Sequence, residues 1–249
     1  MRSENENPQV SRARGFIKCL SQDELNEFHP LQSFSHFCKN GRLFEEEEKP
    51  TNVLILLEGQ VKLYINSSEG KRLILCIAGP GEILGLASAM FGIPYDMTAE
   101  TLQPCRIVSL PIRGFLCFLM RHPTSYENVA RELSLQNRRA CNQLRTIGLV
   151  TTAPAKLARL LLQWEFTGKE TGQGTRLGHS LTHAEIGECI GASRETVTRT
   201  LGDFKQRELA ELYGTFLRIR NRAQLEHCAC QVLSWNTRHK ARHHKHRSE

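Results

Sequence analysis

The sequence lacks any run of the roughly 18–20 uninterrupted apolar residues that a membrane span requires. Its polar first residues, MRSENENPQ, also lack the apolar core of a signal peptide, so we expect a cytoplasmic protein with no membrane partner. The motifs of several enzyme classes are missing too. No glycine-rich phosphate loop follows a strand, and there is no zinc-hydrolase helix pair or nucleophile elbow. The sequence therefore predicts no enzyme.

The cysteines do not form the pattern of a disulfide framework. Nine cysteines are scattered along 249 residues, and their number is odd. Most of them are expected to be small buried apolar residues. Apolar residues make up 40% of the chain and charged residues 24%, which excludes a fibrous or wholly disordered protein. We expect two domains.

The most informative segment is Leu181 to Leu201, with the sequence LTHAEIGECIGASRETVTRTL. Thr182 and Glu185 have the spacing of a capping box, which marks the start of a helix. Gly191 tolerates the left-handed backbone that ends a helix, and Ser193 can cap the helix that follows. Two helices joined by such a tight turn are typical of a helix-turn-helix.

The second helix of this segment has one apolar and one polar face. Val197, Leu201 and Phe204 fall in a narrow stripe that packs inward. Glu195 and Arg199 could form only a surface ion pair, but their place in the first turns after a capped helix and a glycine turn favours DNA contacts. Arginine can donate to guanine, a carboxylate can accept from cytosine, and a threonine methyl can contact thymine. We predict contacts to double-stranded DNA, with Arg207 and Arg218 on the phosphates, from Thr182, Ser193, Arg194, Glu195, Thr198, Arg199, Arg207 and Arg218.

The segment IGECIGASRETVTRTL resembles the recognition segment of the catabolite activator and fumarate-nitrate regulator family, CRP/FNR. Upstream, LLEGQVKLYI at Leu56–Ile65 and AGPGEILG at Ala78–Gly85 resemble the effector-domain β-roll of that family. The arrangement of Arg194, Glu195 and Arg199 is similar to that of the catabolite activator branch. The resemblance implies a transcription regulator that binds a palindromic operator with TGTGA-like half-sites, with RNA polymerase as a further partner.

The rest of the pattern predicts an α+β fold. Between Phe34 and Leu110, apolar runs such as VLILL and RLILCIA alternate with turn signals, which indicates the short strands of a β-roll or double-stranded β-helix. A long helix is expected to begin near Thr124 and a second one at Ala155–Phe166. The glycine-rich stretch Thr167–Gly178 is expected to be a loop, and Leu209–Ile219 to be a wing hairpin. The expected architecture is a cyclic-nucleotide-binding-like β-roll, a long dimerisation helix and a C-terminal winged helix-turn-helix.

Five segments are expected along the chain. They are a polar N-terminal segment (1–22), an effector-type β-roll domain (23–122), a dimerisation helix (123–150), a winged helix-turn-helix domain (151–234) and a basic, histidine-rich tail (235–249).

The long helix carries a candidate dimerisation stripe. Val129, Leu133, Ala140, Leu144 and Ile147 recur at spacings near 3.5, and a polar Gln136 or Asn137 interrupts them. The alternative is a helix that packs on its own domain. A homodimer is favoured because a two-fold operator needs two recognition helices about 34 Å apart.

The expected effector region departs from the cyclic-nucleotide binders of the family. The resemblance implies that those proteins hold the ribose and cyclic phosphate with a Gly-Glu-Leu step and an Arg-Ser or Arg-Ala pair. Here the step is Gly85-Leu86-Ala87, and residues 91–97 contain no arginine. Because a buried phosphate without a charged partner loses several kcal/mol, we do not expect cyclic AMP as the effector, and the cofactor stays unknown. Rough alignment adds two residues from the long helix, so the candidate effector pocket is Gly85, Leu86, Ala87, Cys141 and Asn142.

Three other regulatory mechanisms stay open. The protein could respond to a cyclic nucleotide after all, or Cys141 could sense oxidants beside the dimer axis, although simple packing is the plainer interpretation of that thiol. A Cys/His cluster could also sense a metal, but its spacing matches no closed zinc pattern, and we predict no metal site. That cluster is His227, Cys228, Cys230, His239, His243, His244 and His246.

Overall fold

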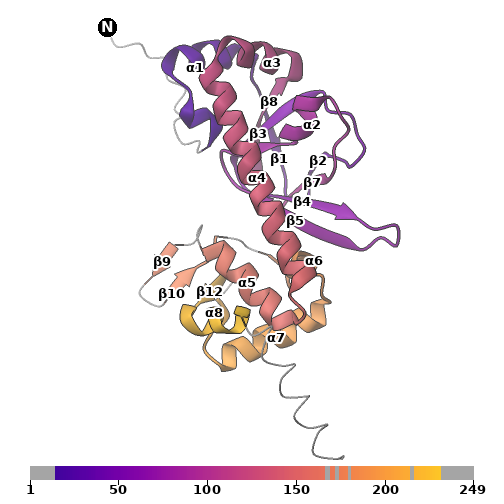
Figure 1. Ribbon diagram of the computed structural model, residues 1–249, viewed down its shortest axis with the longest axis vertical. Coiled ribbons are helices and arrows are strands. Elements are labelled where there is room, and N and C mark those ends of the chain that lie inside the picture. The colour runs from indigo at the N-terminus through magenta and orange to yellow at the C-terminus, as the bar shows by residue number, and fades with distance from the viewer. Residues whose placement is uncertain (1–14, 166–168, 172–173, 179–180, 214–215, 231–249) are drawn as a thin grey trace, which may run out of the picture. The chain divides into compact units, whose positions relative to one another are not determined.

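The computed structural model describes residues 15–165, 169–171, 174–178, 181–213 and 216–230 of the chain. The chain forms two compact units that divide between Cys141 and Asn142, inside the longest helix (Figure 1). Each unit has its own core and is described by itself.

Eight short strands form the β-roll of the first unit. They are β1 (Ser33–Phe37), β2 (Arg42–Phe44), β3 (Asn52–Glu58), β4 (Val61–Asn66), β5 (Arg72–Ala78), β6 (Ile83–Leu84), β7 (Thr98–Thr101) and β8 (Cys105–Pro111). Two antiparallel four-stranded sheets result, with the orders β1-β8-β3-β6 and β2-β7-β4-β5. The predicted β-roll is therefore confirmed, and the apolar runs VLILL and RLILCIA form most of β3 and all of β5.

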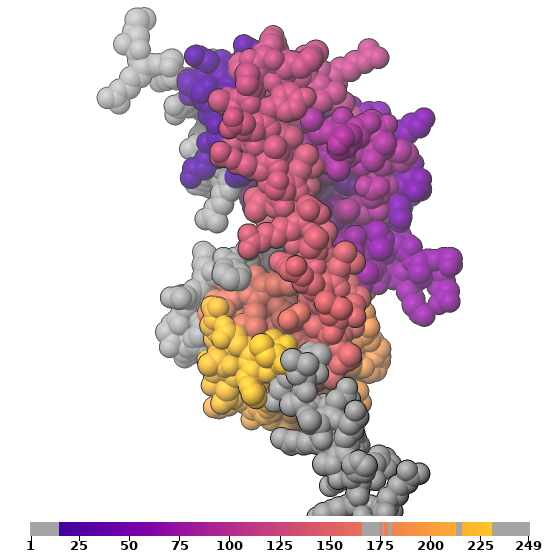
Figure 2. Space-filling view, in the orientation of Figure 1, coloured from indigo at the N-terminus to yellow at the C-terminus, as the bar shows by residue number. Residues whose placement is uncertain are grey.

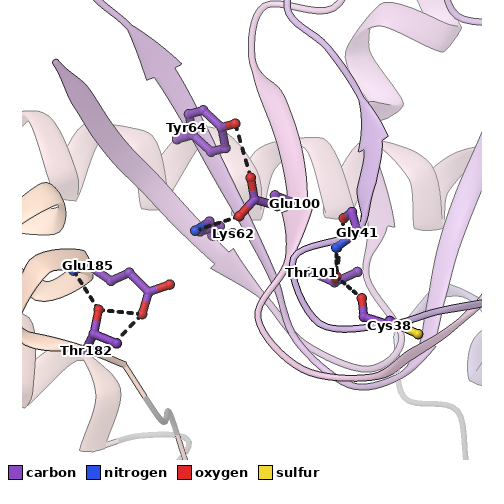
Figure 3. A network of polar contacts seen from close by, with 8 residues as sticks. All are labelled: Cys38, Gly41, Lys62, Tyr64, Glu100, Thr101, Thr182 and Glu185. Carbon is purple, nitrogen blue, oxygen red and sulfur yellow. Dashed lines mark hydrogen bonds and ion pairs between the residues drawn. The ribbon is translucent and has the colours of Figure 1, made fainter. Parts of the chain in front are cut away.

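Buried polar contacts hold the second sheet and its turns. The hydroxyl of Thr101 donates to the carbonyl of Cys38 at 2.6 Å and accepts from the amide of Gly41 at 2.8 Å (Figure 3). On neighbouring strands, Lys62 and Glu100 form an ion pair with an Nζ–Oε1 distance of 2.9 Å. These contacts fix the register of β4 against β7 and the loop that precedes β2.

Helices cover the roll. They are η1 (Phe16–Cys19), α1 (Gln22–Phe28), η2 (His29–Leu31), α2 (Leu86–Phe91), α3 (Ile112–Arg121) and α4 (Pro123–Leu149). Phe28 of α1 and Phe115 and Phe118 of α3 pack with Val53 and Ile55 of β3 in one apolar core. Among the described residues, no helix combines the length and the apolar character that crossing a membrane would require.

The predicted stripe on α4 does not form one exposed face. Val129 is 2% exposed and belongs to the core of the first unit, and Leu133 packs against that core. Leu144, by contrast, is 66% exposed. For the first half of the helix the alternative is therefore correct, because the core of the first unit covers this face of α4 at Val129 and Leu133. Atoms of α4 are visible at the surface in Figure 2.

The second unit is a helical domain with one small sheet. Its elements are α5 (Ala153–Glu165), β9 (Lys169–Thr171), β10 (Gly174–Arg176), α6 (His183–Ile190), α7 (Arg194–Gln206), β11 (Ala210–Tyr213), β12 (Phe216–Ile219) and α8 (Arg222–Cys230). The sheet has the order β11-β12-β10-β9, and the predicted wing is the β11–β12 hairpin. The prediction that Thr167–Gly178 is a loop was wrong, because β9 and β10 form a second hairpin that pairs with β12.

Candidate nucleic-acid interface

The N-terminus of α6 is fixed by the predicted capping box. The amide of Glu185 donates to Thr182 Oγ1 at 3.2 Å, and the carboxylate of Glu185 accepts from the Thr182 amide at 2.9 Å (Figure 3). At the other end, Gly191 has a φ of 64° and its amide donates to the carbonyl of Gly187. Only the left-handed region closes the helix in this way, so both local predictions are confirmed.

Ser193 starts α7 as its N-cap. Its backbone is extended, and its Oγ accepts from the amide of Thr196 at 3.2 Å. The side chain therefore satisfies one of the amides that the first turn of a helix leaves without an intrahelical partner. The predicted helix-turn-helix is thus formed by α6 and α7.

The two faces of α7 differ as their periodicity predicts. Val197, Leu201 and Phe204 are 0%, 6% and 0% exposed and form the inner face with Thr200. Four of the predicted DNA-contacting side chains lie together in the first two turns of the helix and are exposed: Arg194, Glu195, Thr198 and Arg199. This exposed face combines two guanidinium donors with one carboxylate acceptor.

The charges of this face are available to a ligand. The amide of Glu195 itself and the Ser193 hydroxyl hold the pKa of the Glu195 carboxyl below its usual value, so the group is ionised at neutral pH. Asp203 of α7 forms an ion pair with Arg207, the C-cap of the helix, with an Nη1–Oδ2 distance of 3.1 Å. Within the described part of the chain, no such pair joins Glu195 to Arg199.

The two predicted phosphate contacts lie in different environments. Arg207 follows α7 as its C-cap and is exposed, although Asp203 is its partner. Arg218 lies in β12, a central strand of the small sheet, and is only 9% exposed. Arg218 therefore does not belong to the exposed face of α7, and its role on DNA stays a prediction.

His183 is a residue of this site that the sequence did not single out. Its Nδ1 lies 2.8 Å from Thr198 Oγ1, and it occupies the first position of α6 after the N-cap Thr182. No local signal indicated this role, because the contact joins two helices at a separation of 15 residues. Periodicity alone could not identify the partner.

The candidate effector region is occupied by side chains of the protein itself. Gly85 is the N-cap of α2 with a φ of 65°, and a Cβ at this position would overlap the ring carbon Cε1 of Tyr95. Tyr95 is 5% exposed, and its ring stacks on Phe44 with centroids 3.8 Å apart. Leu86 is 1% exposed and packs in the core, whereas Ala87 is half-buried.

Polar side chains of α4 contact the β-roll at Glu82 and Ile83. Gln136 Nε2 donates to the carbonyl of Ile83 at 2.9 Å, and Arg139 forms an ion pair with Glu82. Burial and the nearby Glu82 carboxylate raise the pKa of the Cys76 thiol to about 12, so that thiol is protonated and unreactive. The sequence singled out Gln136 only as a polar interruption of the stripe, and it did not indicate Arg139 or Glu82.

Cys141 and Asn142, the two predicted pocket residues on α4, are more exposed than Leu86. Cys141 is exposed, and Asn142 is half-buried, with its Oδ1 accepting from Arg145 Nη1 at 3.4 Å. The oxidant-sensing role of Cys141 stays a hypothesis, since an exposed thiol alone does not define a sensor.

The structure describes only part of the C-terminal Cys/His cluster. Cys228 in α8 is buried and Cys230 is exposed. Of the nine cysteines, three are buried and five are exposed, so the expectation that most of them are buried was wrong. The four histidines from His239 to His246, and the basic tail that carries them, lie outside the described residues. Within the described ranges, no group of three or more His, Cys, Asp or Glu side chains could hold a metal ion.

Comparisons with known proteins match both units. The family model of the cyclic nucleotide-binding domain matches residues 34–122, and that of the Crp-like helix-turn-helix domain matches residues 155–228. A CRP-like cAMP-activated global transcriptional regulator of Mycobacterium tuberculosis is 30% identical over 190 residues, which cover 76% of this chain and 84% of the relative. The global nitrogen regulator of a Nostoc species is 25% identical, with 82% and 92% covered.

Solved structures agree on the fold. The structure of FixK2 from Bradyrhizobium japonicum superimposes with a TM-score of 0.71 at 21% identity and covers 79% of this chain and 96% of that one. The expected α+β architecture of β-roll, long helix and helix-turn-helix is thereby confirmed, as is the expectation of a regulator and not an enzyme. With a DNA-binding helix-turn-helix and a cyclic-nucleotide-binding-like domain in one chain, this protein belongs to the CRP/FNR family of transcription regulators.

Proposed function

We propose that this regulator binds a palindromic operator with TGTGA-like half-sites as a homodimer. The observation that carries the proposal is the joint exposure of Arg194, Glu195 and Arg199 in the first two turns of α7. Forked arginine donors match the O6 and N7 acceptors of guanine, and the ionised carboxylate of Glu195 matches the amino group of cytosine. The sequence TGTGA presents guanines on one strand and a cytosine opposite each of them.

The dimer follows from the symmetry of such a site. In the predicted stripe of α4, Leu144 is 66% exposed and Ala140, one turn earlier on the same face, is also exposed, which supports a second copy of the chain as the partner of this helix. RNA polymerase is a further partner that membership in this family favours.

The relative from Mycobacterium tuberculosis is named as cAMP-activated, but two side chains here support a different effector. Leu86 is a buried apolar residue and cannot accept a hydrogen bond from a ribose hydroxyl. Tyr95 fills the space beside Gly85 and carries no positive charge for a cyclic phosphate. We therefore propose that DNA binding does not require cyclic AMP in the usual site.

A selection of random double-stranded DNA by the purified full chain at fixed salt tests both parts. We expect an enriched palindrome with TGTGA-like halves in the absence of any ligand, and no change in melting temperature when cyclic AMP is added. Enrichment of a motif with other half-sites would contradict the assigned base contacts. Enrichment only with cyclic AMP, together with a raised melting temperature, would show that the nucleotide binds the folded protein and that our interpretation of Leu86 and Tyr95 is wrong.

A further inference from the structure

We infer that His183 is a positioning residue for base recognition, because its imidazole fixes the side chain of Thr198 on the exposed face of α7. The inference rests on the proposed function, since it concerns how the same helix selects a base pair. Its starting point is the 2.8 Å distance between His183 Nδ1 and Thr198 Oγ1, which joins the first residue of α6 to the second turn of α7.

The hydrogen bonds of Thr198 define the direction of this contact. The hydroxyl of Thr198 carries one hydrogen, and it donates that hydrogen to the backbone carbonyl of Arg194 at 2.9 Å, because a carbonyl can only accept. Toward His183 the same oxygen can therefore only accept. We therefore assign a hydrogen to Nδ1 of His183, which makes both contacts of Thr198 hydrogen bonds and makes His183 the donor.

Two hydrogen bonds hold a side chain that packing leaves free. Thr198 is exposed, whereas its neighbour Val197 is fully buried. A threonine in a helix ordinarily divides between two rotamers, because its hydroxyl can bond to a carbonyl of the preceding turn in more than one way. The bond from His183 adds a donor on a different helix, so that a single orientation satisfies both partners. The methyl group of Thr198 then has a fixed position beside Arg199.

A methyl group in a fixed position can discriminate thymine. Contact with the C5-methyl of thymine is one of the direct signals in the major groove, and its value depends on where the side-chain methyl lies. Thr198 follows Arg194 and Glu195 by one helical turn, so it lies on the same face as the groups that contact guanine and cytosine. His183 thus acts through Thr198 and does not itself need to touch a base.

Binding measurements on a panel of operators with every base pair substituted in turn test the inference. The proteins are the full chain and its variants His183→Ala, His183→Asn and Thr198→Ser, and unrelated-sequence DNA is included as a probe. Thr198→Ser keeps the hydroxyl but removes the methyl, so it identifies the base pair that Thr198 contacts. We expect His183→Ala to lower discrimination at that same base pair by about fivefold. We expect His183→Asn to restore it, because its side-chain amide can place an N–H close to the position of Nδ1.

Several outcomes would overturn the inference. One is that His183→Ala loses affinity equally for every DNA, including the unrelated sequence. Another is that His183→Ala loses discrimination at a base pair other than the one that Thr198→Ser identifies. A His183→Ala protein that keeps both the base preference and the melting temperature of the parent would also overturn the inference. The failure of the proposed function is distinguishable, since the parent protein itself would then show no base preference before any variant is compared.

Discussion

The side-chain amide of Gln143 donates a hydrogen bond to the backbone carbonyl of Cys189, with an Nε2–O distance of 2.6 Å. Gln143 lies in the last turns of α4 and Cys189 in the last turn of α6, and both belong to the second unit. The last carbonyls of a helix lack intrahelical partners, so this amide satisfies one of them inside the protein. The bond connects the end of the long helix to the first helix of the helix-turn-helix.

Replacing Gln143 by Leu should destabilise the second unit. The side chain of Gln143 is 6% exposed, and its loss deprives the Cys189 carbonyl of this donor in a buried place. We expect a loss of about 1–3 kcal/mol in the free energy of unfolding, measured by urea denaturation. Arg145→Ala, at an exposed position of the same helix, is the control and should stay within about 0.5 kcal/mol of the parent. Equal stabilities of the two variants would contradict the role of this bond.

Removing the guanidinium of Arg199 should change base choice as well as affinity. Arg199→Ala is expected to lose about 1–3 kcal/mol of specific binding and to relax preference at one base pair of each half-site. Lys205→Ala is the matched control, because it removes an exposed positive charge from the last turn of the same helix. Its affinity should fall equally for all sequences. Binding titrations at fixed salt separate the two effects, and an unchanged preference profile for Arg199→Ala would reject the base contact.

Local signals made most of the helix-turn-helix predictable from the sequence. Thr182 with Glu185, Gly191 and Ser193 act within four residues of their partners, and each was predicted correctly. The capping box of Ser21 with Glu24 also formed as its spacing indicates. The structure adds that Glu24 accepts from Ser125, which periodicity cannot reveal because the partner belongs to another helix.

Features that depend on distant pairing were missed. The hairpin of β9 and β10 forms because the amide of Leu177 donates to Leu217, and Thr175 pairs with Ile219, in a strand far along the chain. The glycines of that stretch favour turns, but they do not show that strands flank the turn. Tyr95 was likewise invisible as the residue that fills the space beside Gly85, since only the closed β-roll brings the two together.

Replacing Glu208 by asparagine should stabilise the second unit. Its φ is 55°, in the left-handed region after the end of α7, where glycine or asparagine is normally found. This backbone costs an ordinary residue roughly 1–2 kcal/mol, so Glu208→Asn should raise the free energy of unfolding by about 0.5–1 kcal/mol. Gln206→Gly, two residues earlier at the end of the helix, should instead lower it by roughly 0.5–1 kcal/mol. Melting curves of both variants measure the difference, and shifts of equal sign would contradict the assignment of strain.

Acid should lower the free energy of unfolding of the first unit, because it protonates Glu24. Burial alone raises the pKa of this carboxyl, but hydrogen bonds from the amide and hydroxyl of Ser21 and the hydroxyls of Ser125 and Thr124 outweigh it and lower the pKa to about 2. A carboxyl whose pKa is lower in the folded state than in the unfolded state stabilises the fold above its unfolded value of 4.5. That stabilisation is lost as the pH falls through the folded value.

The expected pH window for Glu24 is therefore about 5 down to 2. Glu24→Gln cannot titrate, so its stability should decline less steeply than that of the parent across this window, as measured by denaturant unfolding at each pH. Asp23→Asn, on the neighbouring exposed position of α1, should retain the steep decline of the parent. Parallel profiles for the parent and Glu24→Gln would show that this carboxyl does not contribute to acid sensitivity.

Two glycines at the ends of α2 allow the contact with Tyr95 to be measured apart from backbone strain. Gly85 and Gly92 both have left-handed backbones, with φ of 65° and 68°, and both would be strained as alanine by roughly 1–2 kcal/mol. A Cβ at Gly92 would meet no atom within 4 Å, whereas a Cβ at Gly85 would overlap the Tyr95 ring. Gly85→Ala should therefore lower the free energy of unfolding by more than Gly92→Ala does.

The excess should depend on Tyr95 itself. In a Tyr95→Leu background the overlap is removed but the left-handed backbone is not, so Gly85→Ala and Gly92→Ala should become nearly equal in cost. Urea denaturation of the parent, Gly85→Ala, Tyr95→Leu and the double variant gives the coupling between positions 85 and 95. A coupling near zero would mean that the tyrosine ring moves aside freely, and the space beside Gly85 would then be open to a ligand.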